Sequence, residues 1–285
     1  FRTLDRTGTA QEVKSEELMD GWGSVKYSPT GFFGVVLKGG AMERTPDKYE
    51  ENAAGSGQNP LMRKYNQAYL YRSYGEGIVN LAFGSLPITL GASAFYGDDS
   101  YTLSTIGATT GLDRRYGVDL TWAMTDKLSL YASAGEEKID AKRQGSQAFG
   151  QPDWRFVLED NFETYGAGLR AQPLEKLSLD LDYTYAKGAS KTALVGVNGG
   201  NFPVNESEFS ALTADVTYAM SERIDLALTW RYESFDSSDW AIQGVEPATL
   251  GNVLALGADP YDYSVNYVGA SVRYYFGSRK LSLPE

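Results

Sequence analysis

The chain has 285 residues, with 26 Lys and Arg against 37 Asp and Glu, and it contains neither cysteine nor histidine. Without cysteine there is no disulfide, no thiolate metal site and no covalent c-type haem attachment. Without histidine there is no imidazole base, no Ser-His-Asp triad and no His-ligated haem. The net charge of −11 disfavours nucleic acid, whose binding depends on clustered cations. We therefore predict that the chain is not an enzyme and carries no cofactor of its own; a hard cation held by carboxylates stays open.

Alternation of apolar and polar residues with a period of two is the dominant pattern. In residues 224–233 one face reads Ile, Leu, Leu, Trp and Tyr, and the other reads Asp, Ala, Thr, Arg and Glu. Successive side chains of a strand point to opposite faces, so such a segment has one apolar and one polar side. The pattern recurs in 116–124, 177–185 and 268–276. An all-β fold follows.

The segments that alternate are long, and their connections differ in length. We predict about 12 strands, over residues 1–16, 18–28, 31–45, 63–85, 88–101, 115–124, 128–142, 161–171, 177–188, 207–219, 224–235 and 263–276. Short turns at 28–30, 85–87, 125–127, 173–176 and 221–223 alternate with longer polar links at 46–62, 102–114, 143–160, 189–206 and 236–262. This layout is typical of an antiparallel transmembrane β-barrel of outer-membrane type, with turns in the periplasm and loops outside. A soluble β-sandwich or β-helix is the alternative.

Residues 77–97 carry no charge and have the length of a membrane-spanning helix. Asn80, Pro87 and the turn-like Ser85-Leu86-Pro87 interrupt this stretch, and its apolar residues alternate. We expect two strands and a turn here.

The alternation also predicts which residues face the barrel interior and which face lipid. The residues expected to line the lumen or to contact a partner are Asp119, Asp180, Asp182, Asp225, Arg231, Glu233 and Arg273. Taken singly, each of them is expected to belong to a solvated pore lining or a structural ion pair, whereas the face as a whole is expected to meet a partner. The aromatic residues expected at the lipid interface are Trp122, Tyr131, Tyr183, Tyr218, Trp230, Tyr232, Tyr274 and Phe276.

Other acidic residues carry weaker signals. Glu136 and Glu137 could suggest a glycosidase, but adjacent strand residues point to opposite faces and cannot flank one bond. Asp98-Asp99 and the segment 236–239 could bind Ca²⁺, although their spacing matches no calcium loop. We predict solvated turn residues and no metal site.

Three local sequences go beyond the barrel class. They are Asn59–Asn66 (NPLMRKYN), Gly145–Trp154 (GSQAFGQPDW) and Ser238–Pro247 (SDWAIQGVEP), the last continuing through 252–257 to the final strand 267–276 (YVGASVRYYF). Together they resemble the MtrB/PioB-type decahaem-associated outer-membrane barrels. The resemblance covers residues 1–276 and corresponds to the C-terminal part of such proteins, with the first half and its Cys pair absent. Residues 277–285 run past the family's usual aromatic end and are expected to form a periplasmic tail.

This resemblance implies a function in the bacterial outer membrane. It implies a transmembrane scaffold, residues 1–276, that sheathes a periplasmic multihaem c-type cytochrome in its lumen for electron transfer across the membrane. All haem would then reside in the partner, outer-membrane lipid would surround the barrel, and an extracellular cytochrome could be a second partner. A diffusion porin for small solutes stays open as the alternative function, and a membrane hydrolase would lack the histidine base.

Overall fold

The computed structural model describes residues 2–5, 13–49, 59–84, 86–148, 150–196, 199–240, 248–250, 253–255 and 262–276. Every regular element in these ranges is a β-strand. No helix in this part of the chain has the length and hydropathy needed to cross a membrane. The stretch 77–97 forms two paired strands and the turn between them, as predicted.

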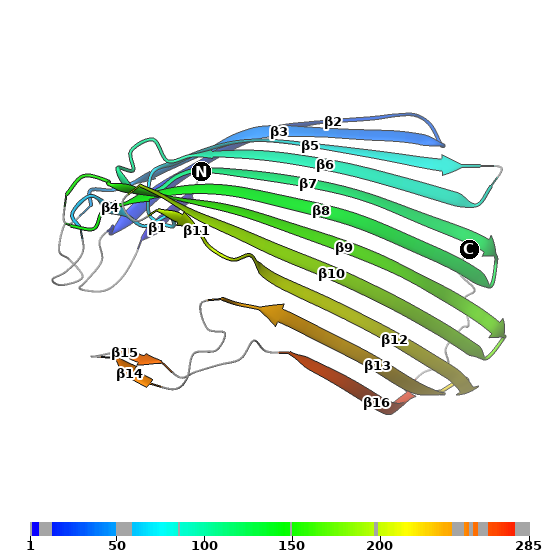
Figure 1. The fold of residues 1–285 in the computed structure, drawn as a ribbon. Helices are drawn as coiled ribbons and strands as arrows, with labels where there is room; N and C mark the ends of the chain where they lie inside the picture. The colour runs from blue at the N-terminus through cyan, green and yellow to red at the C-terminus, as the bar shows by residue number, and fades with distance from the viewer. Residues whose placement is uncertain are drawn as a thin grey trace.

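Twelve strands in the described ranges form one antiparallel path, in which each strand pairs with the next one along that path (Figure 1). They are β1 (Arg2–Asp5), β2 (Ser15–Thr30), β3 (Phe33–Pro46), β5 (Leu70–Phe83), β6 (Ile88–Ser100), β7 (Ile106–Thr125), β8 (Leu128–Gly145), β9 (Trp154–Leu174), β10 (Leu177–Gly196), β12 (Asn205–Ser221), β13 (Ile224–Ser238) and β16 (Tyr263–Tyr274). Two short strands pair with strands of this sheet but lie off the main path: β4 (Met62–Arg63) pairs with β7, and β11 (Gly200–Asn201) pairs with β10. A separate hairpin consists of β14 (Ala248–Leu250) and β15 (Val253–Ala255).

The sheet is curved and open. Figure 1 shows it bending from β2 and β3 on one side to β13 and β16 on the other. Within the described residues no pairing joins β16 to β1 or β2. The chain therefore forms part of a barrel wall.

The connections alternate between the two ends of the sheet, as predicted. Tight turns link β2 to β3, β5 to β6, β7 to β8, β9 to β10 and β12 to β13, and they gather at one end, here called the turn end (Figure 1). The short strands β4 and β11, which belong to two of the longer connections, lie at the other end, here called the loop end.

Several predicted boundaries were wrong. The predicted break between strands 1–16 and 18–28 falls inside β2, where Glu17 pairs with Thr45, while residues 6–12 lie outside the described ranges. The predicted links 102–114, 143–160 and 189–206 are largely strand, because β7, β9 and β10 extend into them. A strand that projects beyond the membrane has water on both faces and loses its alternation, so its sequence resembles a loop.

Little of this molecule is a conventional buried core. Among the described residues, the fully buried large side chains are Val13 and Ile106, and smaller buried apolar residues such as Ala68 and Ala108 join them. Most large apolar side chains of the sheet are instead exposed, for example Val272 at 70%. A soluble sandwich would cover that face with a second sheet, whereas this chain presents a single layer.

Candidate functional site

Register shows which side chains share a face, because residues paired directly across two strands project to the same side. Asp119 pairs with Ser133, Asp180 with Asp215, and Thr213 pairs with both Asp182 and Arg231. Followed across the sheet, these rows place one predicted set together on a single face: Asp119, Asp180, Asp182, Asp225, Arg231, Glu233 and Arg273. We call this the polar face. Contact between these residues and a partner stays a prediction.

The opposite face, called the apolar face, carries most of the predicted aromatic set. Trp122 pairs with Leu130, Tyr183 with Leu212, Tyr218 with Leu226, and Tyr274 with Ile224. Trp230 and Tyr232 alternate with the polar-face residues of β13 and so belong to the same side. Phe276, which follows β16, makes an edge contact with Tyr274 at 5.1 Å between ring centroids.

Tyr131 is on the wrong side for the predicted lipid contact. It pairs with Thr121 and Gly168, which places its ring on the polar face. The guanidinium of Arg170 lies 5.7 Å from the centroid of that ring. Residue type suggested lipid, but Tyr131 is out of phase with Leu128 and Leu130. Its ring covers Gly168, as aromatic side chains do beside glycines in curved sheets.

Glycines on the two faces have very different surroundings. A Cβ added to Gly91 would lie 2.3 Å from the Asp119 carboxylate, and one on Gly166 would lie 2.8 Å from the Ser133 hydroxyl, both on the polar face. On the apolar face, the same atom on Gly23 would meet nothing within 4 Å, and on Gly77 the nearest atom is 3.5 Å away. Side chains converge on the inside of a curved sheet and diverge on its outside. The polar face is therefore the concave one.

Toward the loop end, the last apolar residues of the apolar face are tyrosines. On β10 this face runs from Leu177 through Leu181 and Tyr183 to Tyr185, and Lys187 follows. Lys187 pairs with Glu208 at 3.0 Å. The stretch from Leu177 to Tyr185 matches the roughly 9–11 residues of a strand that crosses a bilayer. Beyond it, the apolar face of β10 carries Lys187 and Lys191.

Ion pairs and hydrogen bonds connect polar-face residues both between neighbouring strands and within one strand. Arg72 on β5 contacts both oxygens of the nearly buried Asp99 on β6, at 2.5 and 2.7 Å. Arg231 pairs with Glu233 at 2.6 Å, and the hydroxyl of Tyr263 donates to the same carboxylate at 2.6 Å. These contacts stabilise the wall and fix the polar side chains in place. Among the described residues, no group of carboxylates is placed to hold a metal ion.

Glu136 and Glu137 face opposite sides of β8, as the alternation predicted. Glu136 pairs with Lys138 at 2.6 Å, and Glu137 with Arg115 at 2.8 Å. Two carboxylates on opposite sides of a sheet cannot act on one glycosidic bond.

Two segments that carry the family resemblance meet at the loop end. The side-chain amide of Asn59 donates to the carbonyl oxygens of Ala148 at 3.2 Å and Gly150 at 3.1 Å. From there the chain forms β4, which pairs with β7 beyond the point where β6 ends. Arg44 holds the end of this connection by donating from Nε to the carbonyl oxygen of Ala68 at 3.0 Å. This contact could not be predicted from the sequence, because the spacing of residues does not show which loops meet.

The third resembling segment lies largely outside the described residues. Its Trp240 stacks on Phe202 with ring centroids 4.7 Å apart. The predicted tail 277–285 also lies outside the described residues.

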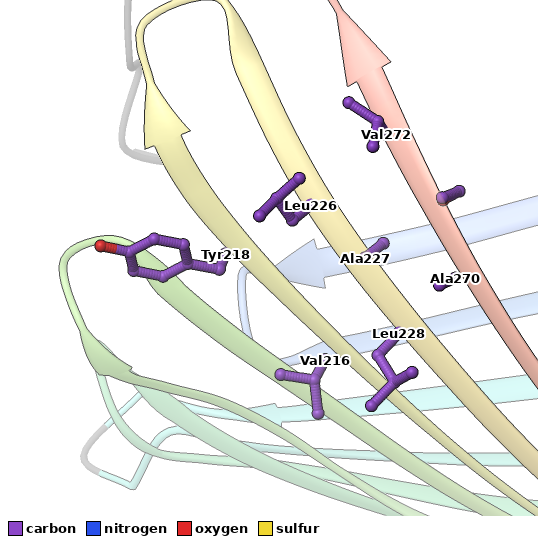
Figure 2. Close-up of a pocket in the computed structure, with 8 residues that line it drawn as sticks. Val216, Tyr218, Leu226, Ala227, Leu228, Ala270 and Val272 are labelled. Carbon is purple, nitrogen blue, oxygen red and sulfur yellow. The ribbon is translucent and has the colours of Figure 1, made fainter.

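A shallow apolar hollow of about 420 Å³ lies between β12, β13 and β16 (Figure 2). Its lining includes Val216, Leu226, Leu228 and Val272 from the apolar face. Its surface is mainly apolar and offers hydrocarbon contact.

The comparisons with known proteins agree with this architecture. Residues 3–276 match the family described as outer membrane beta-barrel porin, MtrB/PioB. The chain is 26% identical over 278 residues to outer membrane protein MtrB of Shewanella baltica (strain OS185), covering 96% of this chain and 39% of that protein. The chain thus spans about two fifths of the length of this relative.

Solved outer-membrane transporters and receptors share the fold at low sequence identity. The ferric citrate transporter FecA is 9% identical with a TM-score of 0.56, over 96% of this chain and 41% of that one. The ferric preacinetobactin receptor BauA from Acinetobacter baumannii is 11% identical with a TM-score of 0.56, over 90% of this chain and 43% of that one. Both likenesses concern the barrel wall alone. The chain, an outer-membrane β-barrel segment of Gram-negative type, belongs to the MtrB/PioB family.

Proposed function

We propose that this wall forms part of a sleeve that sheathes a multihaem c-type cytochrome. The cytochrome carries electrons across the outer membrane through this sleeve. The observation that carries the proposal is membership of the MtrB/PioB family over residues 3–276. The chain supplies the scaffold, and the partner supplies every redox centre.

Two properties of the chain support this division of roles. It contains no cysteine or histidine, so it offers neither the thiols nor the imidazoles that c-type haem requires. Its concave face carries charged side chains already oriented by ion pairs, such as Arg231 with Glu233. A partly desolvated protein partner is better matched by such preorganised groups than by mobile ones.

The proposal is tested by purifying the protein from its native outer membrane in mild detergent. We expect a haem absorption band that co-elutes with the barrel at a fixed ratio, and haem-dependent electron transfer across vesicles that contain the complex. Vesicles with the barrel but without the haem protein should not transfer electrons.

The diffusion porin gives a different result in the same preparation. A colourless barrel from haem-replete cells that conducts ions in planar bilayers would contradict the sleeve and support the porin. The polar concave face suits a water-filled channel as well, so conductance of the native preparation separates the two functions.

A further inference from the structure

Aromatic rings cross the concave polar face from one side of the sheet to the other. We call the following set the inner aromatic stripe: Trp22, Tyr74, Phe95, Phe162, Phe209, Phe235 and Tyr263. The register rows that hold these residues are adjacent: Trp22 and Tyr74 both pair with Gly40, and Phe235 pairs with both Phe209 and Tyr263. Neither the alternation nor the family resemblance pointed to this set, because each ring is isolated within its own strand.

The rings are held in defined positions. Tyr74 stacks with Phe95 at 6.5 Å between centroids, and Phe235 with Tyr263 at 5.7 Å. The Lys38 ammonium lies 5.1 Å from the centroid of Trp22, and the Arg115 guanidinium lies 5.0 Å from that of Phe95. Cation–π contacts of this kind fix both partners.

Glycines beside the stripe leave room for its rings. An added Cβ on Gly188 would lie 3.2 Å from the ring of Phe162, and one on Gly97 would lie 3.1 Å from that of Phe95. This packing nevertheless leaves much of the surface of the rings exposed. Phe162, in the middle of the sheet, remains 41% exposed, and Trp22 is 61% exposed on β2, which beyond Leu18 is paired on one side only within the described residues. Exposed aromatic rings that lie together on a polar concave wall mark a surface suited to contact with a partner.

The course of the stripe indicates what that surface is. Phe95 and Arg115 directly precede Tyr96 and Tyr116, and Phe162 and Phe235 lie within three residues of Tyr165 and Tyr232. On each of their strands these four tyrosines are the last apolar residues of the apolar face before a polar or charged residue toward the loop end. The part of the stripe from β6 to β13 therefore stays near one level of the membrane. A path for a permeating solute would instead run along the pore axis. A stripe around the wall at one level meets a body that fills the cross-section.

We propose that the inner aromatic stripe is the main contact through which the wall grips a folded protein in its lumen. This rests on the proposed sleeve function and adds where the partner is held. Trp, Tyr and Arg are the residue types that dominate the energy of protein interfaces. Lys38 lies on the rings of Trp22 and Tyr74, and its cross-strand neighbour on the polar face is Glu76. The partner should therefore present apolar side chains at this level.

The first test places a photo-crosslinking residue in the full protein in its native membrane. Trp22→p-benzoylphenylalanine and Phe162→p-benzoylphenylalanine should each crosslink to the haem protein. Val25→p-benzoylphenylalanine, on the same strand as Trp22 but on the apolar face, should not. Crosslinks from positions 22 and 162 to another segment of the barrel itself, or none to a haem protein that is present, would overturn the proposal.

The second test separates partner contact from packing of the sheet. Tyr131→Ala is the matched control, because Tyr131 also covers a glycine on the polar face but lies outside the stripe. We expect Trp22→Ala and Phe162→Ala to release the haem protein at least tenfold faster from the isolated complex, while heat-modifiable mobility shows a folded barrel. Tyr131→Ala should release it at the wild-type rate. Equal release from all three variants would mean that the rings act only in packing, and would overturn the proposal.

The two proposals fail in distinguishable ways. A wild-type barrel without any haem protein contradicts the sleeve itself. A haem-loaded wild type whose stripe variants hold the partner normally contradicts only the stripe.

Discussion

Gly39 and Gly40 are neighbours in β3, yet they face opposite sides of the sheet. A Cβ on Gly40 would lie 2.6 Å from the carbonyl oxygen of Gly21 and 2.8 Å from the Cβ of Trp22. A Cβ on Gly39 would have its nearest neighbour, the carbonyl oxygen of Tyr74, at 3.5 Å. The difference follows from curvature, because only the concave face brings adjacent strands' side chains together.

We therefore predict that Gly40→Ala destabilises the folded barrel by about 1–3 kcal/mol, the range for an overpacked site. Gly39→Ala should change the free energy of unfolding by less than about 0.5 kcal/mol. Urea unfolding in lipid vesicles, followed by tryptophan fluorescence, measures both. If the two variants lose equal stability, the assignment of the concave face is wrong.

Among the elements, β4 and the connection that carries it depend on a few specific contacts. Gly107, the residue of β7 opposite Arg63, has φ of +117°, and a Cβ there would lie 2.1 Å from the Arg63 carbonyl oxygen. Asn59 holds the start of the connection through its two bonds to the 146–153 loop. At its far end, the Tyr69 hydroxyl donates to Glu43 at 2.8 Å, and this hydrogen bond raises the pKa of Tyr69.

We expect Asn59→Ala and Gly107→Ala each to release this connection without unfolding the sheet. Trypsin, which can cut after Arg63 or Lys64, should then cleave there faster, by about tenfold if the lost contacts are worth roughly 1.4 kcal/mol. Asn66→Ala is the control, as Asn66 lies in the same connection and makes none of these contacts. Cleavage at the wild-type rate would show that β4 is held by something else.

The strands of the transmembrane part could be predicted because lipid on one side and polar groups on the other impose a strict period of two. The strands of the main path come in the predicted order, apart from the misplaced break between the first two, and the seven polar residues lie on one face. The extensions of β7, β9 and β10 could not be predicted, since water on both sides removes the period. Tyr131 was assigned to lipid by residue type, although it is out of phase with Leu128 and Leu130. The inner aromatic stripe was missed because its rings come together only through the register of strands that are distant in sequence.

For the molecule as a whole, the tolerance of the apolar face to charge depends on the level of the membrane at which a residue lies. Leu228 lies in the middle of the apolar part of β13, whereas Asp236 lies on the same strand and face beyond the tyrosines. The side chain of Leu228 is 50% exposed. The free-energy cost of a charge at this position therefore depends on the lipid outside the barrel and not on burial within the protein.

Leu228→Arg should therefore destabilise the inserted barrel by about 2–4 kcal/mol, as for a cation at the bilayer midplane. Asp236→Arg should cost no more than about 1 kcal/mol. The shift in urea midpoint for the membrane-inserted protein tests the pair, and a similar loss at both positions would contradict the placement of the membrane on this face.

Strand order here follows chain order without a crossover, and tight turns at one end join successive pairs of strands. Each hairpin therefore contributes a section of the apolar face and a section of the polar face, and it pairs in a defined register with the next hairpin. Adding or deleting one hairpin would widen or narrow the wall while leaving the chemistry of every other hairpin unchanged. The circumference of such a barrel can in this way be adjusted in evolution, two strands at a time, to the girth of whatever it encloses.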